Sequence, residues 1–282
     1  MMKQQDTAEA NRRAIRNSPS YRLAEYDIDF LQRDEIRPLR MQLELLKTET
    51  LLRDYRVTST VVVFGSARIV EQSVAEARLR EARQVFKKTP DSPQAQRDVA
   101  VAERLLAKSR FYEEARQFGR IVSTACQVEG RCDLVICTGG GPGIMEAANR
   151  GAFEVGAKNI GLNIDLPHEQ DPNPYITPDL CFRFHYFAMR KFHFILRAKA
   201  LVVFPGGFGT LDELFDTLCL RQTLRMQAIP IILYGREYWE SILKFDKMAD
   251  EGVIDDHDLD LISYAETPEQ AWNIIADFHR LK

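Results

Sequence analysis

The sequence lacks several features that would point to well-known classes of protein. No two of its five cysteines form a C-x-x-C pair, and four of them lie in apolar runs or helical patterns. This usage is typical of reduced structural thiols and predicts a cytoplasmic protein. The first sixteen residues contain no apolar core, so no secretory signal is visible. No apolar run approaches the roughly 20 residues that are needed to span a bilayer.

An excess of charge of one sign is also missing, because 38 basic residues nearly balance 41 acidic ones and the formal net charge is −3. Proteins that bind nucleic acid usually present a broad cationic surface, which this composition does not predict. Histidine, cysteine and acidic residues are not grouped at metal-site spacing, and the G-x-S-x-G pattern of a serine nucleophile is absent. We therefore expect no nucleic acid, membrane or metal among the partners of this chain.

What the 282 residues do contain is an alternation of short apolar runs with helical patterns. The runs are continuous, which is typical of parallel strands that helices cover on both faces. The βαβα order predicts a Rossmann-like, doubly wound α/β fold. The predicted strands are 60–64, 133–137, 159–164, 200–204, 229–233 and 259–263, and the predicted helices that follow are 143–155, 186–198, 211–226, 237–251 and 268–281.

Two charge-rich regions lie outside this alternation. Residues 1–57 predict an N-terminal helical extension, which Pro38 divides, and residues 58–282 predict the nucleotide-binding domain. Within that domain, residues 70–128 predict two helices that separate at 89–93. Residues 70–118 would be a helical insertion, either a solvated hairpin or an oligomer contact.

The segment PGGFGTLDE, Pro205–Glu213, joins a predicted strand to a predicted helix. Free backbone N–H groups and the helix dipole make such a junction an anion site. Three glycines and a threonine of this loop are the candidate phosphate ligands, and Glu213 follows them closely. However, Thr210 and Glu213 also have the spacing of a capping box. The sequence therefore leaves two interpretations of Glu213 open, a structural helix cap and a catalytic acid. The candidate ligands are Gly206, Gly207, Gly209 and Thr210.

Two further loops follow strands and should lie at the same edge of the sheet. The first holds Gly65 and Ser66, and the second is TGGGPG, residues 138–143. The dinucleotide fingerprint G-x-G-x-x-G is imperfect there because Ile144 stands where a third glycine belongs, although Asp165 could serve as a ribose-binding acid. A tight turn without a ligand is the simpler alternative, but glycines at this density favour close approach of a ligand. The candidate binding residues of the second loop are Gly139, Gly140, Gly141 and Gly143.

A pair of basic residues, Arg190 and Lys191, lies on the helix that precedes the PGGFGT strand. Lys191 shares a helical stripe with apolar residues, which is costly unless it reaches water or meets an anion. Arg190 has the planar geometry that suits a phosphate or a carboxylate. The alternative is a solvated pair on a wet face. Glu169, in the loop 166–170, is a weaker candidate for a substrate contact, since most loop carboxylates are simply solvated.

Taken together, GGGPGIMEAANRGA, the triplet MRK and PGGFGTLDE resemble the LOG family, with thirteen residues between Lys191 and Pro205. This is the family of cytokinin riboside 5′-monophosphate phosphoribohydrolases, long mislabelled as lysine decarboxylases. The resemblance covers about residues 60–282, and the extra helical regions resemble a longer bacterial-type member. The family's MHxRK segment is FAMRK here, with Ala188 in place of the histidine, on the side of the pocket that recognises the base.

The resemblance implies a Rossmann-like fold, at least a homodimer with the active site near the interface, and no cofactor. The implied reaction is hydrolysis of the N-glycosidic bond of a nucleoside 5′-monophosphate to free base and ribose 5-phosphate. It assigns Arg190 and Glu213 to catalysis, the PGGFGT glycines and Thr210 to the phosphate, and Glu169 to the substrate. A carboxylate suits this chemistry because bond cleavage builds positive charge on the sugar.

Two other hypotheses remain open at this stage. One is a nucleotide- or cofactor-binding carrier on the same fold without turnover, and the other is a dinucleotide-dependent oxidoreductase, which Ile144 and the acidic residues after PGGFGT disfavour. A true lysine decarboxylase would need pyridoxal phosphate, and nothing around Lys191 resembles a site for that cofactor.

Overall fold

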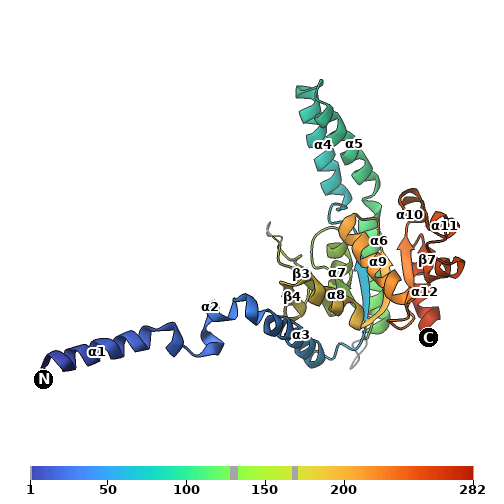
Figure 1. The fold of residues 1–282 in the computed structure, drawn as a ribbon. Helices are drawn as coiled ribbons and strands as arrows, with labels where there is room; N and C mark the ends of the chain where they lie inside the picture. Colours follow the sequence, from blue (N-terminus) through green and yellow to red (C-terminus); the bar gives the residue numbers. More distant parts are fainter. Residues whose placement is uncertain (1, 128–132, 167–170, 282) are drawn as a thin grey trace. The chain divides into compact units, whose positions relative to one another are not determined.

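The computed structural model describes residues 2–127, 133–166 and 171–281, and it separates into two compact units, residues 1–49 and 50–282 (Figure 1). Helix α1 (Met2–Asn17), short helix α2 (Ile28–Leu31) and most of α3 (Arg37–Asp54) belong to the first unit. Pro38 occupies the first turn of α3, where its missing N–H is tolerated. No helix in the described residues is long and apolar enough to cross a membrane.

The second unit contains a seven-stranded, wholly parallel sheet in the order β4-β3-β2-β1-β5-β6-β7. This confirms the α/β prediction. The strand order reverses direction between β1 and β5, and ligands of such sheets bind at that switch point beyond the carboxyl ends of the strands. The strands are β1 (Thr60–Phe64), β2 (Val135–Thr138), β3 (Asn159–Ile164), β4 (Cys181–Phe184), β5 (Ala198–Val203), β6 (Ile231–Tyr234) and β7 (Ile262–Ala265).

Helices cover both faces of the sheet, as the continuous apolar runs require. Within β1, Val61 and Val63 belong to one core cluster, and Val62 and Phe64 belong to the other. The first core packs against α6 (Arg110–Cys126), α7 (Ile144–Glu154) and α12 (Pro268–His279). The second packs against α8 (Phe187–Leu196), α9 (Phe208–Gln222), α10 (Arg236–Ile242) and α11 (Phe245–Asp250).

The described part of the region 70–128 contains three helices rather than the two that were predicted. Helices α4 (Gln72–Lys88) and α5 (Pro93–Ala107) form a hairpin that projects from the sheet domain (Figure 1). Ser92 caps α5 by accepting a hydrogen bond from the Ala95 N–H. The third helix, α6, is not solvated, because Phe111, Tyr112 and Phe118 are buried in the first core. The predicted boundary at residue 118 therefore falls inside a core helix.

Candidate functional site

Three loops at the carboxyl edge of the sheet are joined by backbone hydrogen bonds. The Ser66 N–H after β1 donates to the Pro205 carbonyl after β5 at 3.0 Å, and the Ile144 N–H donates to the Ser66 carbonyl at 3.2 Å. A Cβ at Gly65 would lie 2.6 Å from the Ile144 side chain. Helix α7, which begins at Ile144, therefore packs directly on the loop after β1. The residues of these loops, far apart in sequence, are thus brought together around the switch point.

The glycines of the TGGGPG loop are explained by crowding and by backbone conformation. Gly140 and Gly143 have φ values of +73° and +72°, which residues with a Cβ rarely adopt. A Cβ at Gly143 would lie only 2.4 Å from the Ser66 carbonyl oxygen. Gly139 lies against the guanidinium of Arg190, because a Cβ there would be 2.6 Å from Nη2. This loop therefore forms a wall that closely fits the arginine of α8.

The position at which α9 begins, within the PGGFGT loop, contradicts the capping-box hypothesis. The helix begins at Phe208 with Gly207 as its N-cap, and no side chain caps it. Thr210 is consequently the third helical residue and Glu213 the sixth, so Glu213 cannot reach back as the third residue of a capping box. The interpretation of Glu213 as a helix cap is wrong, and another reason is needed for a carboxylate at this position.

Only one of the three PGGFGT glycines is required by the protein's own packing. A Cβ at Gly206 would lie 2.1 Å from the Thr210 hydroxyl, whereas a Cβ at Gly207 or Gly209 would meet nothing within 4 Å. Neither of these last two glycines has a positive φ. Gly207 is the N-cap, where glycine is favoured over alanine. Gly209 lies inside the helix, where glycine is less stable than alanine, so its open position indicates that an approaching ligand needs the room.

Glu213 is a buried carboxylate beside two basic groups. Its side chain is 3% exposed, and among the described residues no hydrogen bond or ion pair to its carboxylate is found. Burial raises the pKa of Glu213 to about 7, although the charges of Lys191 and Arg190 counteract that rise. A carboxylate that titrates near neutral pH is typical of functional sites.

The Arg190–Lys191 pair serves two different contacts. Arg190 is half-buried, donates from Nε to the Leu162 carbonyl at 2.7 Å, and has its pKa lowered by burial while Glu213 counteracts that effect. Lys191 donates to Asp212 at 2.8 Å; burial opposes its charge, but Asp212 and Glu213 raise its pKa overall. The alternative of a solvated pair on a wet face does not describe Arg190, which packs against Gly139 and interacts electrostatically with Glu213.

Other sequence candidates lie outside this cluster. Asp165 forms an ion pair with Arg183 on the exposed end of β4, and not with the glycine loop. Glu169 falls outside the described residues. Asp255, His257 and Asp258 have potential ligand atoms within 4.8 Å of one another, a grouping that the sequence analysis missed. Two of the three are exposed, and Asp258 already accepts hydrogen bonds from Gln222 and the Asp255 N–H.

The sequence analysis also missed a buried amide network behind the glycine loop. Asn173 donates to the Gly140 and Gly141 carbonyls, and its N–H donates to the Gly140 carbonyl at 2.8 Å. Asn149 accepts from Asn173 and from the Thr138 hydroxyl. Asn149 lies within the segment IMEAANRGA, but one asparagine in a helix gives no signal that it will be buried.

A family model described as "Possible lysine decarboxylase" matches residues 145–275. A pyrimidine/purine nucleotide 5′-monophosphate nucleosidase of Escherichia coli is 32% identical over 121 residues, which are 38% of this chain and 25% of that protein. A cytokinin riboside 5′-monophosphate phosphoribohydrolase of Arabidopsis thaliana is 32% identical over 152 residues, 52% of this chain and 65% of that protein. The match thus spans a quarter of the bacterial relative's length and somewhat less than two thirds of the plant relative's.

Among solved structures, the molybdenum cofactor binding protein of Rippkaea orientalis matches 60% of this chain and 87% of its own. The TM-score is 0.43 at 22% sequence identity.

Proposed function

We propose that this chain, a member of the LOG family, hydrolyses the N-glycosidic bond of nucleoside 5′-monophosphates to a free base and ribose 5-phosphate. The relatives are named for such activities, and the family-level activity accords with the residues at the switch point. The observation that carries the proposal is the buried Glu213 carboxylate, whose pKa burial raises to about 7, in electrostatic interaction with Arg190 and at the start of a helix with an open glycine loop.

The phosphate would bind at the start of α9. The Phe208 and Gly209 N–H groups precede the first hydrogen bonds of the helix, which Thr210 and Leu211 donate to the Gly207 carbonyl, and the open Cβ positions of Gly207 and Gly209 leave room for phosphate oxygens. Thr210 adds a hydroxyl on the same turn. Binding energy gained at the phosphate, remote from the bond that breaks, then orients the ribose.

Glu213 would stabilise the sugar as the bond to the base breaks. Departure of the base leaves an oxocarbenium-like sugar, and a nearby carboxylate lowers the energy of that positive charge. The same carboxylate can orient or deprotonate the attacking water, since its pKa lies near the working pH. Arg190 would hold ribose hydroxyls or phosphate and favour the ionised form of Glu213.

The test is incubation of the purified chain with a panel of nucleoside monophosphates, AMP included, followed by chromatography for free base. Release of base that depends on Glu213 supports the proposal. Tight binding of a nucleotide without release of base would instead favour a non-catalytic carrier on the same fold. The panel also compares cytokinin-type with unmodified bases, and Ala188 stands on the segment where the family has a histidine.

A further inference from the structure

Two neighbouring side chains of α10 hold the backbone that leads into the PGGFGT loop, residues 205–210, to which we assign the substrate's phosphate and which we call the phosphate loop. The Tyr238 hydroxyl donates to the Gly206 carbonyl at 2.7 Å, and the Trp239 Nε1 donates to the Val203 carbonyl at 3.1 Å. Trp239 is fully buried and fixes the position of this helix, whereas Tyr238 is only half-buried. A group that displaces the Tyr238 ring will therefore act directly on Gly206.

The exposed side of Tyr238 faces a cavity of about 540 Å³. This cavity lies between α10 and the junction of α5 with α6. The junction is at the base of the projecting hairpin (Figure 1). Its volume falls within the range of small-molecule sites and suits a nucleotide-sized ligand. The residues that matter for its chemistry are Lys108, Arg110, Phe111, Glu237 and Tyr238.

The lining of this cavity has an excess of positive charge and two aromatic rings. The Lys108 Nζ lies 5.9 Å from the Tyr238 ring centroid, and Lys108 forms no ion pair with any described residue. The Arg110 guanidinium lies 4.6 Å from the Phe111 ring centroid, and its nearest acidic partner, Glu114, is 3.9 Å away. Glu237 is the acidic residue of the lining, so two basic side chains outnumber one acid. Basic groups beside an aromatic ring favour an anion that carries a flat ring.

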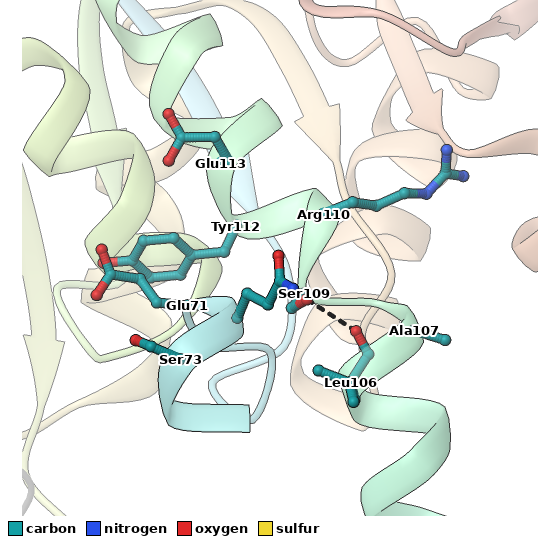
Figure 2. A pocket seen from close by; sticks show the side chains of 9 residues that line it. Glu71, Ser73, Leu106, Ala107, Ser109, Arg110, Tyr112 and Glu113 are labelled. Carbon is teal, nitrogen blue, oxygen red and sulfur yellow. Dashed lines mark hydrogen bonds between the residues drawn. The ribbon is translucent and has the colours of Figure 1, made fainter. Parts of the chain in front are cut away.

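A second cavity on the other side of the α5–α6 junction has the opposite character. It measures about 520 Å³, and the charged and aromatic residues of its lining are Glu71, Arg110, Tyr112 and Glu113, so acidic groups outnumber basic ones. Figure 2 shows the Arg110 side chain extending away from the other three, and Glu71 is already paired with Arg150 at 2.5 Å. The cation-rich cavity beside Tyr238 is therefore the better candidate for an anionic ligand.

We propose that the cavity beside Tyr238 binds a nucleotide-sized organic phosphate, with its phosphate on Lys108 and Arg110, and that Tyr238 transmits this binding to the phosphate loop. The ring of the ligand lies against Tyr238, because Phe111 is buried in the first core beneath Arg110. Because the Tyr238 hydroxyl holds the Gly206 carbonyl, occupancy of the cavity changes how firmly the loop holds its own phosphate. The hairpin insertion, whose last helix leads into Lys108, thereby forms part of a regulatory site.

The first experiment measures ADP binding to the full chain by calorimetry, with ribose 5-phosphate at saturation to occupy the phosphate loop. The expected result is an ADP binding event that Lys108→Gln weakens roughly tenfold, the scale of one lost charged hydrogen bond. Lys87→Gln, at the exposed end of α4, is the matched control and should leave binding unchanged. If ADP does not bind, or if Lys108→Gln and Lys87→Gln bind it with equal affinity, the proposal of an ADP site beside Tyr238 is wrong.

ADP that bound only at the phosphate loop would be insensitive to Lys108→Gln and sensitive to Gly209→Ala, so failure of this site is distinguishable from failure of the proposed function.

The second experiment measures KM for AMP with and without ADP. We expect ADP to shift KM at least threefold in the natural chain and to leave it unshifted in Tyr238→Phe, which still binds ADP. A shift of the same size in Tyr238→Phe overturns the coupling through Tyr238.

Discussion

Replacement of Gly209 by alanine should make the protein more stable and a poorer enzyme. Gly209 is the second residue of α9, its φ is not positive, and a Cβ there would meet nothing within 4 Å. Alanine is favoured over glycine in a helix by about 0.5–1 kcal/mol, partly because it restricts the unfolded chain. For a unit of this size, that gain raises Tm by roughly 1–4 °C.

The same methyl group would project into the space that we assign to the substrate's phosphate. We expect KM for AMP to rise at least tenfold, which corresponds to a loss of about 1.4 kcal/mol of binding free energy. The assays are thermal unfolding and initial rates of base release over a range of AMP concentrations. A loss of activity that accompanies a gain in stability cannot be attributed to misfolding.

Gly206→Ala provides the contrast. Its Cβ would lie 2.1 Å from the Thr210 hydroxyl, so this variant should lose stability as well as activity. If Gly209→Ala is more stable but keeps the KM of the natural chain, the open position of Gly209 does not serve a ligand. The assignment of the phosphate to this loop would then have to be abandoned.

Three other predictions concern the charges around Glu213. Since the ionised carboxylate is the active form and its pKa is about 7, kcat/KM should rise about tenfold per pH unit below 7 and level off above it, as a pH–rate profile will show. Glu213→Gln should abolish base release and, in urea titrations, stabilise the fold at pH 8 by up to about 3 kcal/mol but little at pH 5. The raised pKa predicts this sign because native-state stability falls between pH 4.5 and 7, where the carboxyl is ionised in the unfolded chain but still protonated in its buried native position. Lys191→Met should move the acid limb of the pH–rate profile to higher pH, because Lys191 lowers the pKa of Glu213; an unmoved limb would show that Lys191 does not act on this carboxylate.

Much of the fold was accessible from the sequence because buried parallel strands have a strong signal. Six of the seven strands were predicted from continuous apolar runs, with boundaries within a few residues. The missed strand, Cys181–Phe184, contains Arg183, lies at the edge of the sheet and alternates between buried and exposed positions. A four-residue alternating segment at an edge carries too little hydrophobic pattern to be distinguished from a loop.

The helices were predicted less well, for reasons that differ from case to case. In α6, Phe111, Ala115 and Phe118 repeat at helical spacing, so the buried face was readable, but the surrounding charges favoured a solvated hairpin instead. Helix α9 begins three residues earlier than predicted. Glycine has a low helix propensity, so the glycines of this segment favoured a loop, whereas the tertiary structure requires a helix there. The predicted helix 237–251 ends at Ile242 and resumes at Phe245 without a proline or glycine to mark the break.

The sequence identified the residues of the candidate site better than it identified their structural roles and contacts. Sequence spacing identified Glu213, Arg190 and the glycine loops, but it could not show whether Glu213 caps a helix. That question depends on where α9 begins, which Gly207 decides as the N-cap. Sequence spacing also gave no sign of Tyr238, whose contact with Gly206 joins residues 32 positions apart.

The packing of Arg190 explains why the two glycine loops and α8 depend on one another. Its guanidinium fits against Gly139, where any side chain would occupy its place, and its Nε is fixed by the Leu162 carbonyl of β3. An arginine held this firmly costs free energy through burial, as its lowered pKa indicates, and Glu213 partly offsets that cost. Glu213 is itself destabilised by burial, so neither charge is favoured by folding alone. A polar ligand that interacts with both groups would recover the free energy that the folded protein spends on placing them, and this is the physical reason to expect a nucleotide between them.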